Sequence, residues 1–170
     1  MKITFRQLAE KDLPDRVRWF NDPEVARYFG PQVRSGTTIA KQRKWLKNLK
    51  DQDDRMDFII TVDSKPVGSM GLIEINKVDK NAGLYIFIGE KNFWGTGVAV
   101  DALKFLADKT FKKLKLHKLW LHVYSPNARA IRCYEKFGFK TEAHLPEMVL
   151  LDGKYHDEIF MSLTNPGGKL

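Results

Sequence analysis

The feature that most limits how this chain can fold is a glycine loop between a strand and a long helix. The apolar run Leu84–Ile88 is typical of a buried strand, and an amphipathic pattern begins at Val98. The loop between them includes Phe93-Trp94-Gly95-Thr96-Gly97. Glycines permit a positive φ and let a ligand approach the backbone closely. Free N–H groups and the dipole at the helix start suit a phosphate, so the loop predicts a phosphate-binding turn, with a plain turn as the alternative.

Two common phosphate-binding motifs do not fit this loop. A Walker loop needs Gly-Lys-Ser or Gly-Lys-Thr at its end, and none follows. A dinucleotide-binding fingerprint needs a third glycine at its own spacing, which is also missing. We therefore expect a different phosphate-bearing cofactor.

Length and composition are those of one ordinary globular domain. The chain has 170 residues, of which 43% are hydrophobic and 29% charged. No apolar run approaches the roughly 20 residues of a membrane span, and residues 1–6 lack the core of a signal peptide. We therefore expect a cytoplasmic protein without a membrane partner. Cys133 is the only cysteine, so no internal disulfide can form, and a small buried helix residue is expected there.

The net charge of +8 favours anionic partners, either nucleic acid or a polyanionic cofactor or substrate. The basic residues are spread along the chain, with one local cluster at Lys109, Lys112, Lys113, Lys115 and Lys118. A solvated face accounts for such a cluster. The four histidines lack metal-ligand spacing, so we expect no metal site.

Hydrophobic periodicity predicts alternating strands and helices. Strands are expected at residues 3–6, 58–62, 67–75, 81–88, 118–124, 139–151 and 155–163. The 139–151 strand is interrupted at Pro146, and Asp152-Gly153 is a hairpin turn. Helices are expected at residues 13–20, 24–28, 39–50, 98–113 and 128–136.

This order predicts an α/β fold, a twisted mixed sheet of about six to seven strands with helices on both faces. The connection from residues 84–88 through the long helix to 119–123 is a candidate right-handed crossover between parallel strands. A single domain is expected over residues 1–164, and residues 165–170 are expected to form a flexible tail.

A second informative segment runs from Asn127 to Phe139. Asn127 and Tyr134 are seven residues apart, and seven steps of about 100° return to nearly the same helix face. A cap residue and a phenol therefore point the same way, two turns apart. If this helix follows the strand beside the glycine loop, both residues face the ligand of the loop. The alternative is that Asn127 only caps the helix and Tyr134 only fills the core.

Together the two segments resemble the GCN5-related N-acetyltransferase (GNAT) superfamily. The matching motifs, in this order, are Trp94-Gly95-Thr96-Gly97-Val98-Ala99, then Asn127-Ala128-Arg129-Ala130, Tyr134-Glu135-Lys136 and Gly138-Phe139. The resemblance covers residues 3–163. Within the superfamily the chain is similar to the branch of ribosomal-protein N-terminal and spermidine N-acetyltransferases, on residues 72–76, 116–123 and 152–157.

The resemblance implies acetyl-CoA as the cosubstrate and no metal. It implies that backbone groups of Ile86, Phe87 and Ile88 contact the pantetheine arm and the thioester. It implies that one loop wraps the pyrophosphate, formed by Trp94, Gly95, Thr96, Gly97, Val98, Ala99 and Val100. Asn127 is expected on the same cofactor side. The branch often has Gln or Arg in place of Trp94, a departure of little cost because backbone N–H groups do most of the binding.

The implied reaction is direct attack of a primary amine on the thioester, catalysed by an acyltransferase. The amine must be neutral, so its proton leaves through water to a carboxylate or another base. A strand N–H near Phe87 or Ile88 can stabilise the oxyanion. Tyr134 matches the family's position for the acid that protonates the departing CoA thiolate.

The base is less well defined by the sequence. Many relatives carry Glu in the strand before the cofactor loop, where this chain has Gly83. Glu74 matches a substrate-site acid of the spermidine enzymes, so it is the first candidate for the base or for part of its water chain. The alternative for Glu74 is a solvent-facing strand residue, and Glu147 and His144 are lesser candidates.

For the acceptor, we expect a protein N-terminus, an amino sugar or a small amine rather than a polyamine. A polycation needs an acidic mouth, and the spermidine enzymes have a Glu-rich stretch after the first helices. Here residues 30–35 contain a basic residue and no acid. Trp19, Phe20, Tyr28 and Phe29 are candidates for the acceptor pocket or for the core. The alternatives are a polyamine acetyltransferase and a non-catalytic nucleic-acid-binding domain, and the resemblance leaves open an edge-strand homodimer.

Overall fold

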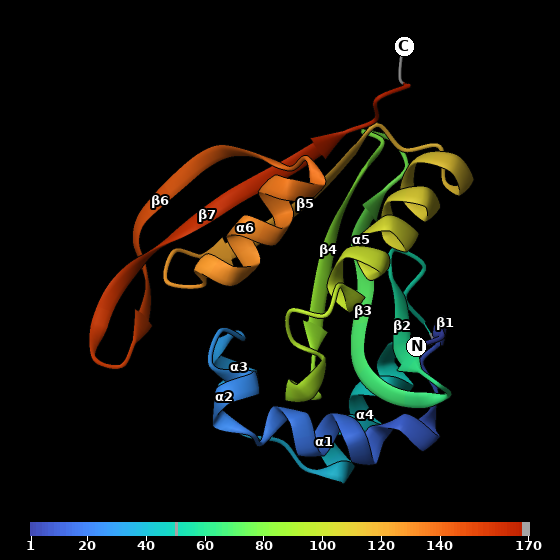
Figure 1. Ribbon diagram of the computed structural model, residues 1–170, viewed down its shortest axis with the longest axis vertical. Coiled ribbons are helices and arrows are strands. Elements are labelled where there is room, and N and C mark those ends of the chain that lie inside the picture. Colours follow the sequence, from blue (N-terminus) through green and yellow to red (C-terminus); the bar gives the residue numbers. More distant parts are fainter. Residues whose placement is uncertain (50, 168–170) are drawn as a thin grey trace.

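Seven strands form one sheet in the order β1-β2-β3-β4-β5-β7-β6 in the computed structural model, which describes residues 1–49 and 51–167 (Figure 1). The strands are β1 (Ile3–Gln7), β2 (Met56–Val62), β3 (Lys65–Asn76), β4 (Asn81–Ile88), β5 (Lys118–Tyr124), β6 (Lys140–Leu151) and β7 (Lys154–Thr164). The α-helices are α1 (Leu13–Phe20), α2 (Pro23–Ala26), α3 (Pro31–Arg34), α4 (Ile39–Leu49), α5 (Val98–Asp108) and α6 (Ala128–Phe137). Shorter helical segments lie at Glu10–Asp12, Lys91–Phe93 and Lys109–Lys113. The predicted α/β fold is confirmed.

Local signals set the helix ends where the sequence predicts them. The Asp22 side chain accepts hydrogen bonds from two backbone N–H groups and starts α2. The Thr38 hydroxyl accepts from the Lys41 N–H at 3.3 Å, at the start of α4. Asn127 caps α6, and Gly138, at φ 113°, ends it in the left-handed conformation.

β4 and β5 are the only parallel neighbours in the described sheet, and they pair at one end only. Their register joins Asn81–Gly83 to Lys118–Trp120. Beyond Gly83, the Leu84–Ile88 segment of β4 pairs with β3 on one side but with no described strand on the other. In Figure 1 the two strands lie together at the top and spread apart below. The gap between residues 84–88 of β4 and the part of β5 beyond Trp120, here called the wedge, positions the site.

Helices cover both faces of the sheet, as predicted. Phe58, Ile60 and Val62 of β2 join the main core beneath α5, and β5 contributes its own alternate residues to that core. The intervening Ile59 is fully buried and lies opposite Ser69 of β3. Arg16 of α1 reaches Ser69 and also Gln42 of α4, so α1 and α4 cover this second face.

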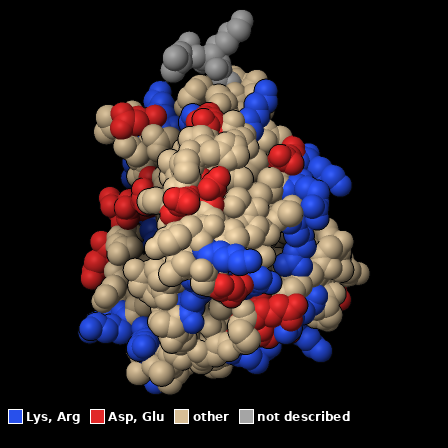
Figure 2. Space-filling model, turned by 90° about the vertical axis from the view of Figure 1, so that its left-hand side faces the viewer, with Lys and Arg blue, Asp and Glu red and all other residues tan. Residues whose placement is uncertain are grey.

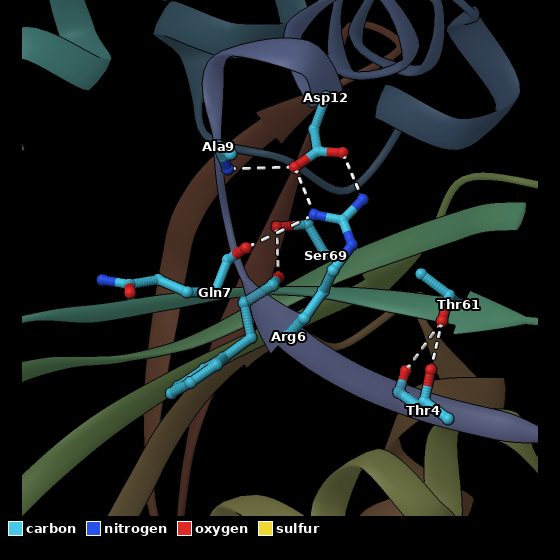
Figure 3. Close-up of polar contacts among 8 residues, drawn as sticks. Thr4, Arg6, Gln7, Ala9, Asp12, Thr61 and Ser69 are labelled. Atoms are coloured by element: carbon cyan, nitrogen blue, oxygen red, sulfur yellow. Dashed lines mark hydrogen bonds and ion pairs between the residues drawn. The ribbon is translucent and has the colours of Figure 1, made fainter. Parts of the chain in front are cut away.

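An ion pair with a buried carboxylate joins the start of α1 to the first strand (Figure 3). Arg6 donates two hydrogen bonds to Asp12, at 2.7 and 2.5 Å, and Asp12 also accepts from the Ala9 N–H at 2.9 Å. Asp12 is 1% exposed. Burial opposes its charged form, but the hydrogen bonds from Arg6 and Ala9 outweigh that effect and lower the pKa of Asp12. The pair therefore holds α1 in place against the sheet.

The sequence did not predict α3, which has Pro31 in its first turn, where the missing N–H costs nothing. The predicted interruption of the 139–151 strand at Pro146 corresponds to a bulge, since the pairing of β6 with β7 shifts register between Leu145 and Val149. Residue 50 of the predicted 39–50 helix and residues 168–170 of the predicted tail lie outside the described residues.

Candidate active site

The wedge between β4 and β5 opens into a cavity of about 1370 Å³. Its walls come from β4, β5 and the glycine loop, from one side of α6, and from residues of α1 to α4. Pockets for drug-sized ligands occupy about 300–1,000 Å³, so this cavity has room for two substrates. Because the gap lies between two strands, it is open to both faces of the sheet.

The glycine loop lies in the wall of the cavity with its two glycines at positive φ. Gly95 has φ 78° and Gly97, the N-cap of α5, has φ 93°. A Cβ at either position would meet no atom within 4 Å, so a ligand can come directly against this backbone. The start of α5 then points its free N–H groups at the same place.

Five of the seven loop residues predicted to bind the cofactor line the cavity, namely Trp94, Gly95, Gly97, Ala99 and Val100. The other two have different surroundings. Val98 is fully buried in the main core, and the Thr96 hydroxyl donates to the Phe93 carbonyl at 2.8 Å. The position of Val98 follows from the apolar face of α5, which turns it toward the sheet.

The backbone of β4 presents alternate residues to the gap. Gly89 N–H bonds to Val67 of β3 at 2.8 Å, so the backbone groups two residues away, those of Phe87, also face β3. Those of Ile86 and Ile88 face the gap instead. One of them is engaged: the Trp94 indole donates to the Ile88 carbonyl at 2.8 Å. Among the three predicted residues, Phe87 therefore offers its ring to the cavity rather than its backbone.

Asn127 and Tyr134 both line the cavity from α6. The Asn127 side chain accepts from the Ala130 N–H at 3.4 Å, so it caps the helix as well. Tyr134 is 9% exposed and packs on Phe139. Burial raises the pKa of the Tyr134 phenol, and the neighbouring Cys133 adds to that shift. The phenol is therefore protonated at neutral pH and can act as a proton donor.

The sequence did not predict a row of basic residues on α6, here called the basic stripe. Arg129, Arg132 and Lys136 all line the cavity, and their spacing places them along one side of the helix. The Arg129 guanidinium lies 4.0 Å from the centre of the Trp94 ring, so it joins α6 to the glycine loop across the gap. Cations facing an open glycine loop suit the phosphates of a CoA molecule.

The opposite face of the sheet presents a second set of side chains to the same gap. A Cβ on Gly83 would come 2.8 Å from the Trp120 ring, which puts these two on one face. By strand alternation Tyr85, Phe87 and His122 share that face. Each of the three lines the cavity, and so does Glu158 of β7. Glu158 lies 3.5 Å from the Nδ1 atom of His122.

None of the predicted bases lines this cavity. Glu74 lies by a separate hollow formed with Asp53 and Asn76, at the closed end of the wedge. It has φ 49° and interrupts the register between β3 and β4. His144 and Glu147 belong to β6 and also stay outside the cavity. The only carboxylates among the cavity's described lining residues are Glu24 and Glu158.

The aromatic residues predicted for the acceptor pocket divide between pocket and core. Phe20, Tyr28 and Phe29 line the cavity, and the Tyr28 hydroxyl donates to the Pro126 carbonyl at 3.3 Å. Trp19 is 1% exposed and donates to Glu90 at 2.8 Å, so it belongs to the core beneath them.

The charge around the cavity is strongly basic. Seven of its described lining residues are Arg or Lys, against the two glutamates, and they are Arg16, Arg27, Lys41, Arg55, Arg129, Arg132 and Lys136. The predicted Lys109–Lys118 cluster lies elsewhere, and two of its members pair with acids, Lys112 with Asp108 and Lys118 with Glu142. On the outer face in Figure 2, acidic side chains lie among the basic ones. Two of the seven cations pair with acids outside the lining, Arg27 with Asp152 and Arg55 with Asp57, so the excess of positive charge comes from the other five.

No group of three or more His, Cys, Asp or Glu within residues 1–49 and 51–167 could hold a metal ion. Within the same residues, no helix is long and apolar enough to cross a membrane.

Known proteins are similar to this chain in sequence and in fold. A family model described as "Acetyltransferase (GNAT) domain" matches residues 2–140. Spermidine N(1)-acetyltransferase of Escherichia coli K12 is 30% identical over 161 residues, covering 95% of this chain and 85% of that protein. The Vibrio cholerae protein of the same name is 33% identical over 156 residues, covering 92% and 89%. The crystal structure of spermidine N-acetyltransferase from Vibrio cholerae in complex with CoA and spermine has a TM-score of 0.87 and 27% identity, covering 96% of this chain and 95% of that one.

Proposed function

This chain belongs to the GNAT family and is an acetyl-CoA-dependent N-acetyltransferase, and on that premise we propose that it acetylates a primary amine other than a polyamine. The observation that carries the choice of acceptor is the set of basic lining residues outside α6, because those of α6 are assigned to the phosphates of CoA. They are Arg16, Arg27, Lys41 and Arg55. The acceptor classes that remain are a protein N-terminus, an amino sugar and a small amine.

The two substrates approach from opposite faces of the sheet. Acetyl-CoA supplies the acetyl group as a reactive thioester. The glycine loop and the basic stripe of α6 hold its phosphates, and the gap-facing backbone of Ile86 and Ile88 holds its arm. The amine enters from the face of Tyr85, Phe87 and His122. This arrangement lets the amine nitrogen add to the carbonyl carbon over one face of the planar thioester, and the tetrahedral intermediate then expels the thiolate on the cofactor side.

Tyr134 donates the proton to the departing thiolate. Three properties support this role: the residue lines the cavity, it lies on the α6 side, and burial keeps its phenol protonated. No other tyrosine on α6 competes with it. A donor held in this position stabilises charge only as it develops on sulfur, so it speeds the chemical step rather than binding.

The proton of the amine leaves through water to Glu158, with His122 beside it. Glu158 lines the cavity on the amine side, where a base is needed, and lies 3.5 Å from His122. Glu74, the first candidate from the sequence, would need a longer water chain, because it lies by a different hollow. It stays a prediction, to be tested beside Glu158.

A polyamine acceptor is the second candidate, and the relatives favour it. The relatives from Escherichia coli and Vibrio cholerae described above are both named spermidine N-acetyltransferases. The basic cavity opposes this candidate, since a polycation placed near several guanidinium groups is repelled. Residues 30–35, most of which form α3, also include Arg34 and no acidic residue.

An amine panel separates the two candidates. Release of free CoA from acetyl-CoA is measured with spermidine, spermine, a tripeptide with a free N-terminus, glucosamine and putrescine, each over a range of concentrations. We expect the tripeptide or the amino sugar to have a kcat/KM at least tenfold above that of spermidine. A kcat/KM for spermidine above all the others would overturn the proposal in favour of the polyamine.

A further inference from the structure

Two arginines line the cavity beside Tyr85, on the amine side. Arg16 comes from α1, and Arg55 lies just before β2. Both line the cavity together with Trp45 of α4 and Tyr85 of β4. The Trp45 ring lies 4.3 Å from the Arg16 guanidinium and 5.5 Å from that of Arg55, so it packs against both.

Arg16 is a buried cation whose direct partners are neutral. It is 3% exposed, and its Nε and Nη1 atoms donate to Gln42 at 3.1 Å and to Ser69 at 2.9 Å. A guanidinium has five N–H donors, so several remain for a ligand. No carboxylate within the described residues forms an ion pair with Arg16.

The nearest carboxylate is already engaged. Asp57 accepts two hydrogen bonds from Arg55, at 2.8 and 3.0 Å, and one from the Tyr85 hydroxyl at 2.5 Å. The cluster of Arg16, Arg55 and Asp57 therefore carries one excess positive charge. Burial lowers the pKa of Arg16, and the charge of Asp57 opposes that shift. Arginine remains protonated in proteins even so, and a buried charge without a partner is costly.

We propose that Arg16 and Arg55 form a subsite for an anionic group, a carboxylate or a phosphate, that the acceptor amine carries. The subsite rests on the acetyl-transfer function proposed above and narrows its substrate class. The N–H donors that Arg16 does not use on Gln42 and Ser69 can bind either group, while Arg55, whose Nε and Nη2 are held by Asp57, contributes positive charge. Lys41, which lines the cavity as well, adds to the attraction. Spermidine and spermine have no anionic group and cannot satisfy this subsite.

Matched pairs of amines test the subsite by kinetics. Alanyl-alanine is compared with its C-terminal amide, and glucosamine 6-phosphate with glucosamine, so that each pair differs by one anionic group. We expect KM to be about tenfold or more lower for the anionic member of at least one pair, and the pair affected identifies carboxylate or phosphate. In Arg16→Gln we expect that advantage to vanish, with the anionic KM raised about 10–10²-fold and the neutral KM unchanged.

Two control variants distinguish loss of the anionic subsite from a general loss of structure. Arg43→Gln removes the same charge from α4 at an exposed position, where the side chain is 61% exposed and pairs with Glu10. We expect it to keep the anionic advantage. Arg16→Lys keeps the charge without the planar fork, and we expect part of the advantage to return. Unchanged acetyl-CoA affinity in each variant shows that the cavity has kept its shape.

A binding measurement decides the subsite even if no amine in the panel is acetylated. The Arg16 Nε–H signal, assigned by its loss in Arg16→Gln, is followed by ¹⁵N NMR while inorganic phosphate or acetate is added at constant ionic strength. We expect a saturable shift of Arg16 and none of Arg43. Equal KM values within both pairs, or an Arg16 signal that does not saturate, would overturn the subsite and leave the acetyl-transfer function standing.

Discussion

Tyr134 combines the two properties that a proton donor to sulfur needs, since it borders the cavity and keeps its proton. Tyr134→Phe retains the ring that packs on Phe139 and removes only the hydroxyl. A positioned general acid is worth about 10²–10⁴-fold, and a CoA thiolate is already a fair leaving group. We expect kcat to fall about 10–10²-fold with acetyl-CoA affinity little changed, measured by single-turnover rates and calorimetry. A wild-type rate for the chemical step at every pH would make Tyr134 a core aromatic only.

The pH profile of the same variant gives an independent check at Tyr134. Burial raises the pKa of this phenol above its ordinary value of about 10, so the acid form persists to a higher pH than in free tyrosine. The wild-type rate should therefore hold through pH 10 as far as this group is concerned, and decline above it. In Tyr134→Phe that alkaline decline should be absent or altered.

Glu158 and Glu74 are separated by paired substitutions. We expect Glu158→Gln to lower kcat at least tenfold at neutral pH and to recover as the pH approaches the pKa of the amine, because the amine then deprotonates without help. Glu74→Gln serves as the comparison, and from its place in a separate hollow we expect a nearly unchanged rate. The reverse order of the two effects would restore Glu74 as the base.

The glycine loop acts as an element, through the backbone at the start of α5. Gly97→Val forces a β-branched residue into φ 93° and projects its side chain into open space meant for phosphate. We expect acetyl-CoA affinity, measured by calorimetry, to fall at least about tenfold. Separately, the positive φ should lower the free energy of unfolding by roughly 1–2 kcal/mol. Gly153→Val, at φ 75° in the β6–β7 turn and also without neighbours, imposes a similar strain far from the loop. Equal losses of affinity in both variants would refute the loop assignment.

What the sequence could and could not predict follows from the range of the interactions. The glycine loop and the Asn127 cap are local features, so periodicity and spacing predicted them together with the strands around them. The Arg16–Ser69 contact joins residues 53 positions apart, and Arg55 and Tyr85 come from still other elements. Nothing in the local pattern marks such residues as neighbours. For Glu74 the strand was predicted correctly, but the bulge at φ 49° could not be.

At the scale of the whole molecule, the Arg6–Asp12 pair contributes stability that depends on pH. The pKa of Asp12 is lowered in the folded state, so its contribution is complete above the unfolded value of about 3.9 and is lost as the pH falls below it. We expect Asp12→Asn to lower the free energy of unfolding by about 1–3 kcal/mol at pH 7 and to weaken its decline in acid. Urea unfolding at several pH values measures both effects.

Asp15→Asn is the matched control for that measurement. Asp15 lies in the first turn of α1, three residues after Asp12, and pairs with Arg18. Its side chain is 32% exposed, whereas that of Asp12 is 1% exposed. Pairs with exposed carboxylates contribute little, so we expect a change of less than about 1 kcal/mol. An equal effect of the two substitutions would mean that negative charge near the start of α1, rather than the buried Asp12 carboxylate, sets the stability.

The edge-strand homodimer stays a prediction, which light scattering can decide.

β4 and β5 pair only at residues 81–83, so the angle between the strands there sets their separation at the site. Ile88 lies five residues beyond Gly83, which is about 17 Å of extended chain. A change of about 5° in that angle therefore moves Ile88 by about 1.5 Å, and an error of about 1 Å in the placement of reacting groups can cost about 10²-fold in rate. Gly83 lies in this short pairing, where an added Cβ would come 2.8 Å from the Trp120 ring. A residue outside the cavity lining thus limits how wide the gap between the two strands can be.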